Sequence, residues 1–287
     1  MADPRVEKLA DLLTNYCVAV QPGDKVMLRG SSSALPLVGE TYRAVLRAGG
    51  HPSLVWQDDI FSEIFFEEAD EAQLNHVPGP MELMYETYDC LISVRGASNT
   101  RALSAVAPAR QAQRRKAMQG IMKTYMTRAA AGELRWVGTM FPTSAYAQEA
   151  DMSLRDYEDF VYGACHVDKD DPVAEWLKLH EMQKLVDWLK GKSEVVVKGP
   201  NAELTLSIAG RTFINSDGKR NMPSGEIFTG PVENSVNGWV RFTYPAIYAG
   251  REVDGVALRF EDGKVVEASA KKNEEFLLSV LDTDPGA

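Results

Sequence analysis

The 287-residue sequence has few cysteines, few histidines and no long apolar run, and these shortages exclude several classes of protein. The three cysteines, Cys17, Cys90 and Cys165, are widely separated and odd in number, so they do not make the disulfide framework of a small secreted protein. No stretch approaches the roughly 18 apolar residues that a membrane helix needs, and the charged N-terminal segment lacks the apolar centre of a signal peptide. The sequence therefore predicts a cytoplasmic protein with no membrane partner.

Excess basic charge and phosphate-binding loops are also missing. The 31 Lys and Arg residues are outnumbered by 41 Asp and Glu residues, which gives a net charge of -10. Nucleic acids and anionic membranes favour clustered Lys and Arg, so no nucleic-acid partner is expected. Neither a G-x-G-x-x-G fingerprint nor a Walker loop occurs, and nothing in the sequence favours dinucleotide or nucleoside triphosphate chemistry.

The first two thirds of the sequence alternates between helix and strand patterns. Apolar residues at three- and four-residue spacing predict helices over 4–20 and 34–48, and short apolar runs predict strands over 25–29 and 53–57. A strand, a helix and a strand with short joints form a βαβ unit, which implies a parallel sheet. The same reasoning predicts further helices at 61–69, 80–87, 108–131, 153–164 and 171–189, and further strands at 89–94 and 134–140.

After residue 191 the pattern changes to strands. Six strands are expected, at 194–198, 203–208, 226–229, 238–244, 252–260 and 264–270, and a helix at 274–281 follows them. The Asp262-Gly263 pair between the last two strands is a strong hairpin signal. The predicted fold class is α/β: an N-terminal domain (1–191) with a mainly parallel sheet flanked by helices, followed by a β-rich antiparallel domain (192–287) that looks incomplete.

Three short patterns of chemical interest have simpler structural interpretations. Ser32 lies where a strand turns into a helix, as in a nucleophile elbow, but no histidine follows His180 to complete that triad, and a helix N-cap is favoured. The pair His180-Glu181 begins like the zinc motif H-E-x-x-H, but a lysine occupies the second histidine position, which favours an exposed helix face. His166 and Asp168 stand among other possible ligands, where a charged interhelical loop is the better interpretation.

A late segment, residues 221–234, holds an acidic residue between proline and glycine pairs. Its prolines fix backbone angles and its glycines permit angles that other residues avoid. Glu226 begins a short extended run, in which Glu226 and Phe228 face one side while Ile227 and Thr229 face the other. Such a carboxylate is either a partnered structural group or a ligand, and composition alone favours the structural role.

A series of motifs spans nearly the whole chain in order. These are KLA (8–10), VQPGD (20–24), YRAVLRAGGHP (42–52), SNT (98–100), PT (142–143), AQEADMS (147–153), DPV (171–173) and GEIFTGP (225–231). Together they resemble the aminopeptidase T/aminopeptidase S family of metallo-aminopeptidases, and the last motif is the most diagnostic. The resemblance reverses the interpretation of Glu226, which matches a metal-binding glutamate of that family.

The resemblance also implies an activity, a cofactor and an assembly. Members of the family are homodimers that remove N-terminal residues from peptides with two divalent metal ions, such as zinc, cobalt or manganese. Their other ligands and an active-site tyrosine lie further towards the C-terminus and are not found in this sequence. We therefore expect a truncated form of a longer enzyme, with Glu226 as the only metal ligand present, inactive or nearly so and not necessarily metal-bound. The alternative is a non-catalytic peptide-binding or scaffolding protein that kept the fold.

Overall fold

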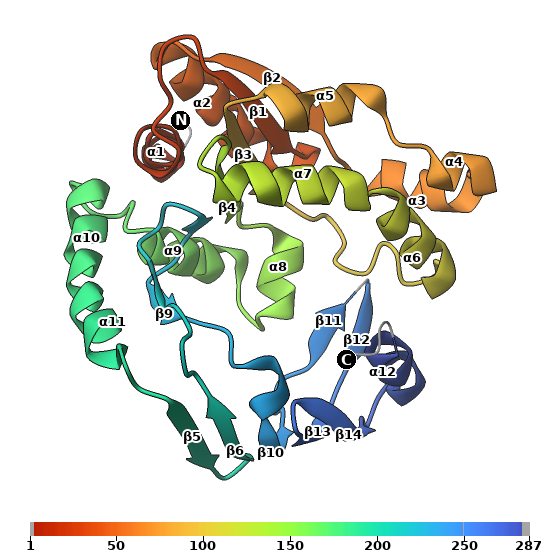
Figure 1. The fold of residues 1–287 in the computed structure, drawn as a ribbon. Helices are drawn as coiled ribbons and strands as arrows, with labels where there is room; N and C mark the ends of the chain where they lie inside the picture. The colour runs from red at the N-terminus through yellow and green to blue at the C-terminus, as the bar shows by residue number, and fades with distance from the viewer. Residues whose placement is uncertain (1–2, 249, 283–287) are drawn as a thin grey trace. The chain divides into compact units, whose positions relative to one another are not determined.

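The computed structural model describes residues 3–248 and 250–282 (Figure 1). The chain divides into two compact units. The first comprises the residues up to His180 together with Ser216–Glu226, and the second comprises Glu181–Asn215 and the residues after Glu226. The domain boundary expected at residue 191 stays a prediction, but the grouping of 216–226 with the N-terminal part was not foreseen. Among the described residues, no helix has the length and apolar character needed to cross a membrane.

The first unit is built on a five-stranded parallel sheet in the order β2-β1-β3-β4-β8. Its strands are Lys25–Gly30 (β1), His51–Trp56 (β2), Cys90–Arg95 (β3), Arg135–Met140 (β4) and Asn221–Met222 (β8). The chain passes from β1 to β2 on one side and then to β3 on the other side of β1, so the sheet is doubly wound. The predicted α/β class with a parallel sheet is confirmed.

Helices surround this sheet at most of the predicted positions. They are Pro4–Asp11 (α1), Leu35–Arg47 (α2), Asp59–Glu68 (α3), Glu71–Asn75 (α4), Gly79–Thr87 (α5), Pro108–Ala117 (α6), Gln119–Ala130 (α7), Ser144–Glu149 (α8), Leu154–Ala164 (α9) and Pro172–Lys178 (α10). A π-helical turn, Leu12–Cys17, continues α1, and a 3-10 turn, Ser32–Ala34, precedes α2.

Two helices predicted as continuous are each divided in the structure. The helix expected over 108–131 breaks at Met118, whose backbone (φ -84°, ψ 1°) leaves the helical range just before the weak helix former Gly120. The helix expected over 171–189 is interrupted by a 3-10 turn, Leu179–Met182, which leads into Gln183–Leu189 (α11). Such tighter turns are common at helix ends and as connectors, and this one lies where the chain leaves the first unit.

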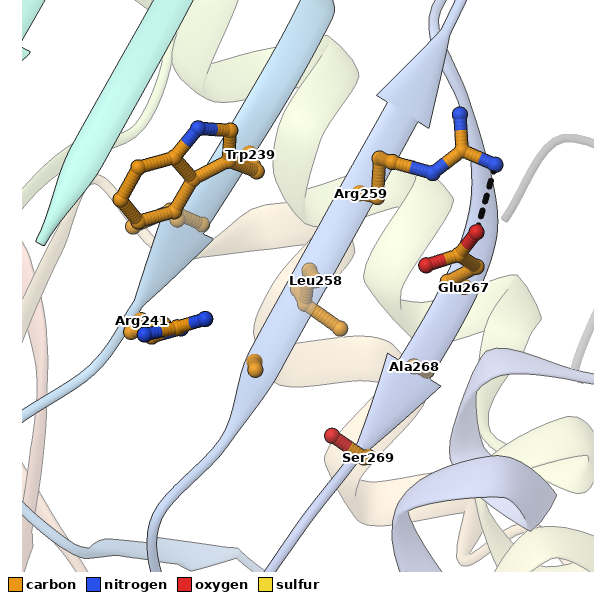
Figure 2. A pocket seen from close by; sticks show the side chains of 9 residues that line it. Trp239, Arg241, Leu258, Arg259, Glu267, Ala268 and Ser269 are labelled. Carbon is orange, nitrogen blue, oxygen red and sulfur yellow. Dashed lines mark ion pairs between the residues drawn. The ribbon is translucent and has the colours of Figure 1, made fainter.

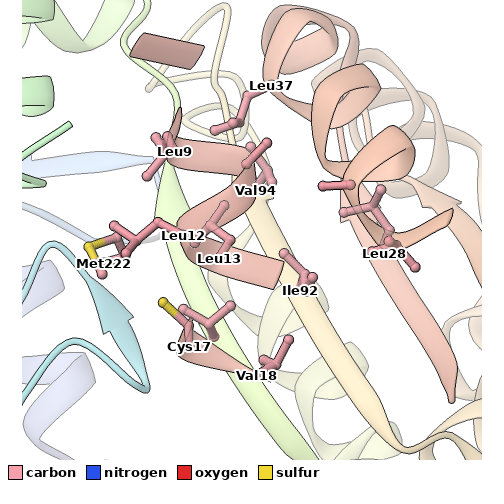
Figure 3. Packing of buried hydrophobic residues seen from close by; sticks show 14 of the residues in the cluster. Leu9, Leu12, Leu13, Cys17, Val18, Leu28, Leu37, Ile92, Val94 and Met222 are labelled. Atoms are coloured by element: carbon pink, nitrogen blue, oxygen red, sulfur yellow. The ribbon is translucent and has the colours of Figure 1, made fainter. Parts of the chain in front are cut away.

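The strands of the first unit send alternate side chains into two separate cores. Val26 and Leu28 of β1 are fully buried in one cluster with residues of α1, α2, α9 and α10, while Met27 between them is buried in a second cluster with residues of α5 and α7. Helices therefore cover both faces of the sheet (Figure 1). Met222 of β8 belongs to the first cluster, together with Leu12 and Leu13 (Figure 3).

The second unit contains a five-stranded antiparallel sheet in the order β14-β13-β10-β6-β5. Its strands are Glu194–Gly199 (β5), Ala202–Ser207 (β6), Asn237–Arg241 (β10), Ala257–Glu261 (β13) and Lys264–Ser269 (β14). Two-stranded pairs join Ile214–Ser216 (β7) to Glu226–Phe228 (β9) and Ala246–Tyr248 (β11) to Arg251–Val253 (β12), and Glu274–Leu281 (α12) follows.

The antiparallel part contains two strands that the sequence did not predict, β7 and β11, and it differs from the prediction in two further ways. The strand expected at 252–260 is two strands, β12 and β13, separated by Gly255 at a positive φ of 65°. The strand expected at 226–229 pairs with β7 instead of joining the main sheet. The predicted hairpin is confirmed, because Asp262 and Gly263, with φ of 47° and 83°, connect β13 to β14 as a tight turn requires.

Candidate functional site

Glu226 ends a segment that is anchored to the first unit. The hydroxyl of Tyr16 donates a hydrogen bond of 2.8 Å to the carbonyl of Asp217. The hydroxyl of Thr139 donates one of 2.7 Å to the carbonyl of Met222, whose side chain is buried in the core. The segment before Glu226 is therefore held by β4, by the π-helical turn and by core packing.

The turn immediately before Glu226 is fixed by local bonds. The amide of Gly225 donates to the carbonyl of Ser216 at 3.1 Å, and the hydroxyls of Ser216 and Ser224 lie 2.5 Å apart. Gly225 has a φ of 102°, a conformation that only glycine adopts without strain. The alternation predicted for β9 is confirmed, since Glu226 and Phe228 are exposed while Ile227 is half-buried.

The surroundings of Glu226 do not amount to a metal centre within the described part of the chain. There, its carboxylate makes no hydrogen bond or ion pair with another described residue. Residues 3–248 and 250–282 contain no group of three or more His, Cys, Asp or Glu side chains placed to hold a metal ion. A two-ion hydrolytic site needs several ligands for each ion, so the residues present do not fit one by themselves. The role of Glu226 as a ligand stays a prediction.

The Ser32 hydroxyl is engaged by a carboxylate. It donates a hydrogen bond of 2.6 Å to Oδ2 of Asp58, and the Ser32 amide donates one of 2.6 Å to Oδ1. The indole of Trp56 donates to the same carboxylate at 2.9 Å. The predicted role of Ser32 as an N-cap is wrong in detail, because the group that caps this turn is the Asp58 carboxylate. Within the part of the chain that the structure describes, no histidine contacts the Ser32 hydroxyl, as the nucleophile-elbow mechanism requires.

Removing the Asp58 carboxylate should produce a stability loss that depends on pH. The hydrogen bonds from Ser32 hold the pKa of this carboxyl below its ordinary value of 3.8. A depressed folded-state pKa stabilises the fold above the unfolded pKa, and this stabilisation is lost as pH falls through the folded value. For Asp58→Ala we expect a loss of about 1 kcal/mol at pH 7, allowing for solvent screening, and a smaller loss at pH 3, measured by urea unfolding. Glu67→Ala, an exposed carboxylate on α3, is the control and should change little at either pH; equal losses for Asp58→Ala at both pH values would contradict the assignment.

The two histidine patterns have the structural roles that the sequence favoured. His180 lies on the exposed 3-10 turn after α10, with Nε2 3.3 Å from a carboxylate oxygen of Asp217. His166 and Asp168 lie in the loop between α9 and α10. The ring of His166 packs 5.2 Å from that of Trp176, and Lys169 lowers the pKa of Asp168. Within residues 3–248 and 250–282, neither pattern is part of a group of three or more side chains placed to hold a metal ion.

The second unit carries a shallow cavity of 480 Å³ on one face of its main sheet (Figure 2). The strand register places Trp239, Arg259 and Glu267 in one row across β10, β13 and β14. An ion pair of 2.7 Å joins Arg259 to Glu267, and Arg241 lies 5.3 Å from the centre of the Trp239 ring. Arg259 and Glu267 thus neutralise each other, Arg241 contacts an aromatic ring, and among the described residues that line the cavity no nucleophile lies beside a base.

The first unit carries a larger cavity, of 980 Å³, which the sequence analysis missed. It is lined by residues at the carboxyl ends of β1, β2 and β3 and by side chains from α3, α5 and α7. The sequence does contain a signal for this cavity. A polar residue lies at the end of each of these three strands or directly after it, as in Gly30-Ser31, Gln57-Asp58 and Arg95-Gly96.

Comparison with known proteins identifies the family. The family described as "Thermophilic metalloprotease (M29)" matches residues 2–287. The chain belongs to this family. The resemblance inferred from the ordered motifs is thereby confirmed, and by this resemblance the M29 chain is a metallopeptidase.

The curated relatives of the M29 chain carry aminopeptidase names. Aminopeptidase 2 of Geobacillus stearothermophilus is 30% identical over 308 residues, an alignment that covers 99% of this chain and 74% of the relative. Aminopeptidase PepS of Streptococcus thermophilus is 27% identical over 315 residues, an alignment that covers 98% of this chain and 74% of the relative. A solved structure, wild-type AmpT from Thermus thermophilus, superposes with a TM-score of 0.82 at 24% identity, over 98% of this chain and 75% of that one. This last similarity supports the fold.

Proposed function

We propose that this M29 protein functions in the removal of N-terminal amino acids from peptides, in a reaction that depends on two divalent metal ions. The observation that carries the proposal is the family match over residues 2–287, together with relatives named as aminopeptidases. Peptides are the substrates. Zinc, cobalt and manganese are the candidate ions, and a cytoplasmic homodimer is the proposed form of the protein, as the resemblance implies.

Glu226 is the residue that we propose as a metal ligand. Its carboxylate is exposed, and the segment before it is held by Tyr16 and Thr139, so that its backbone is positioned while its side chain is open to a ligand. Carboxylate oxygens are suitable donors for divalent zinc and manganese. A single carboxylate does not hold two ions, so we further propose that the 287 residues alone have little activity. No catalytic step is assigned to the described residues.

The test is an assay of the 287-residue chain on amino-acid p-nitroanilides with added zinc, cobalt or manganese, and with a chelator as the blank. We expect release of p-nitroaniline to stay near the blank with each metal, because one ligand cannot lower the pKa of a bound water and orient a peptide at once. Aminopeptidase 2 of Geobacillus stearothermophilus serves as the positive control. Full metal-dependent turnover would contradict the proposed inactivity while supporting the proposed reaction.

The alternative function is binding of peptides without cleavage. It is favoured by one observation, namely that the described residues bring together no group of three metal-binding side chains. The two functions differ in what a longer natural form of the protein would do. Metal-dependent cleavage by such a form would exclude the binding-only role, and peptide binding without cleavage in every form would support it.

A further inference from the structure

The large cavity of the first unit lies at the topological switch point of the parallel sheet. The strand order is β2-β1-β3-β4, so the connections that leave β1 and β3 run to opposite sides. In open α/β sheets ligands bind outside the carboxyl ends of the strands at this place. The lining of the cavity includes Arg29 and Gly30 from the end of β1, Trp56 from β2 and Arg95 from β3.

The loops after β1 and β3, which both contribute residues to the cavity, are in direct contact. The hydroxyl of Ser31 donates a hydrogen bond of 2.6 Å to the carbonyl of Gly96. A Cβ at Gly96 would lie 2.9 Å from the Cβ of Ala34, so the two loops approach as closely as a glycine permits. Ser31 and Gly96 both line the cavity, so this contact fixes the two loops that border it.

One wall of the cavity is apolar and remains accessible. Phe61 of α3 and Met122 of α7 line it with 61% and 53% of their surface exposed. Phe65 and Met81 complete this wall. A ligand with a large apolar group would bury this surface, which favours binding by roughly 25 cal/mol for each Å² removed from water.

Most charged groups of the cavity already have partners. The guanidinium of Arg29 donates to the Gln57 side chain at 2.7 Å and to the Tyr85 hydroxyl at 3.1 Å. Arg114 donates to the backbone carbonyls of residues 74 and 76. The carboxylate of Asp58 occupies the start of the turn before α2, where a nucleotide phosphate binds in many proteins of this topology. A phosphate at that position is therefore disfavoured.

Two charges remain available to a ligand. Among the described residues, the Arg95 side chain has no hydrogen-bond or ion-pair partner, and it is exposed and lines the cavity. Asp59 accepts hydrogen bonds from the Ser98 amide, the Ser98 hydroxyl and the Asn99 amide, all at Oδ2. Its Oδ1 accepts none within the described part of the chain. Tyr146 also lines the cavity; burial raises the pKa of its hydroxyl above the ordinary value, while the nearby charge of Arg95 acts to lower this pKa and that of Asp59 to raise it.

We propose that this cavity binds a free amino acid with a large apolar side chain, with its carboxylate on Arg95, its ammonium group on Asp59 and its side chain against Phe61 and Met122. One free cation, one half-occupied carboxylate and an apolar wall match a zwitterion with an apolar group better than a simple anion or cation. The binding site itself is argued from the cavity alone. Only the biological role of its ligand rests on the proposed function, because free amino acids of this kind are products of an aminopeptidase.

The test is calorimetric titration of the metal-free protein, in the presence of a chelator, with L-phenylalanine, phenethylamine and 3-phenylpropionate. Saturable binding of phenylalanine is expected, and each analogue should bind about tenfold more weakly or worse because it lacks one charge-assisted contact. Arg95→Gln and Asp59→Asn should each weaken phenylalanine binding by about tenfold or more. Phe61→Ala should weaken it through loss of the apolar wall, and it changes no charge.

The controls separate this site from the proposed metal ligand. Arg155→Gln, an exposed arginine on α9, and Glu226→Gln should leave phenylalanine binding unchanged. Absence of saturable phenylalanine binding, binding of either analogue as tightly as phenylalanine, or unchanged phenylalanine binding in Arg95→Gln would each overturn the inference. The result is independent of the peptidase assay. An active peptidase that fails to bind phenylalanine would contradict only this inference. An inactive protein that binds phenylalanine would support the binding site and leave the proposed peptidase function unsupported.

Discussion

Glu226→Gln is expected to lower metal-dependent cleavage of an amino-acid p-nitroanilide by more than about 100-fold, in whichever form of the protein carries that activity. The substitution keeps the size and the hydrogen-bonding oxygen but removes the charge that a divalent ion requires. Mutation of a residue that only supports a metal ligand typically lowers metal affinity or activity by about 10–100-fold, so the loss of a direct ligand should exceed that range. The measurement is kcat and KM at saturating metal, with metal affinity determined separately by titration.

The matched control for this experiment is Glu233→Gln. Glu233 is also an exposed glutamate that follows the same stretch of chain, and it lies in the short turn Glu233–Ser235 rather than on β9. A ligand role predicts that metal affinity falls in Glu226→Gln and not in Glu233→Gln. If both variants retain metal-dependent activity, Glu226 does not belong to the metal site. If both lose it with unchanged metal affinity, the effect is structural.

The elements of the parallel sheet could be predicted because each carries a local signal. The strands β1 and β3 are short apolar runs, and α2 and α9 show amphipathic spacing, with Ser153 capping α9 through the amide of Asp156. These signals depend on residues close in sequence. Breaks within predicted helices were missed, since residues such as Met118 carry no strong breaker signal of their own.

The attachment of segment 216–226 to the first unit could not be read from the sequence. The strand β8 has two residues, too few for any periodicity, and its place beside β4 depends on a partner about 80 positions earlier. The segment is held by the carbonyls of Asp217 and Met222, and backbone acceptors are the same at every position. Glu226 itself was found through a family motif and not through its chemistry.

The cavity at the strand ends illustrates a related limit. Asp58 and Asp59 belong to no motif in the sequence, and their partners, Ser32 and Ser98, lie 26 and 39 residues away. Only the doubly wound topology brings these loops to one edge of the sheet. The sequence therefore predicts that such an edge exists, whereas the structure is needed to say which charges at the edge remain unpaired.

Trp176 of α10 packs against the segment 216–226, which carries Glu226, and lies in the same core cluster as Met222 of that segment. It is 1% exposed, and its indole nitrogen donates a hydrogen bond of 3.1 Å to the carbonyl of Cys165. A Cβ at Gly218 would lie 2.9 Å from its ring, so the backbone of the 216–226 segment rests directly on the indole. Truncation of this side chain would leave a cavity beneath that segment.

Trp176→Ala is therefore expected to lower the free energy of unfolding by about 3–5 kcal/mol, the range for removing a buried aromatic side chain, measured by urea unfolding followed by far-UV circular dichroism. Hydrogen exchange in residues 216–226 should rise more than in β1, because the segment loses its packing surface while the centre of the sheet keeps its own. The control is Trp188→Ala on α11, where the ring is 63% exposed and contacts Lys192, and it should cost less than about 1 kcal/mol. Similar losses in the two variants would show that burial of Trp176 does not hold this segment in place.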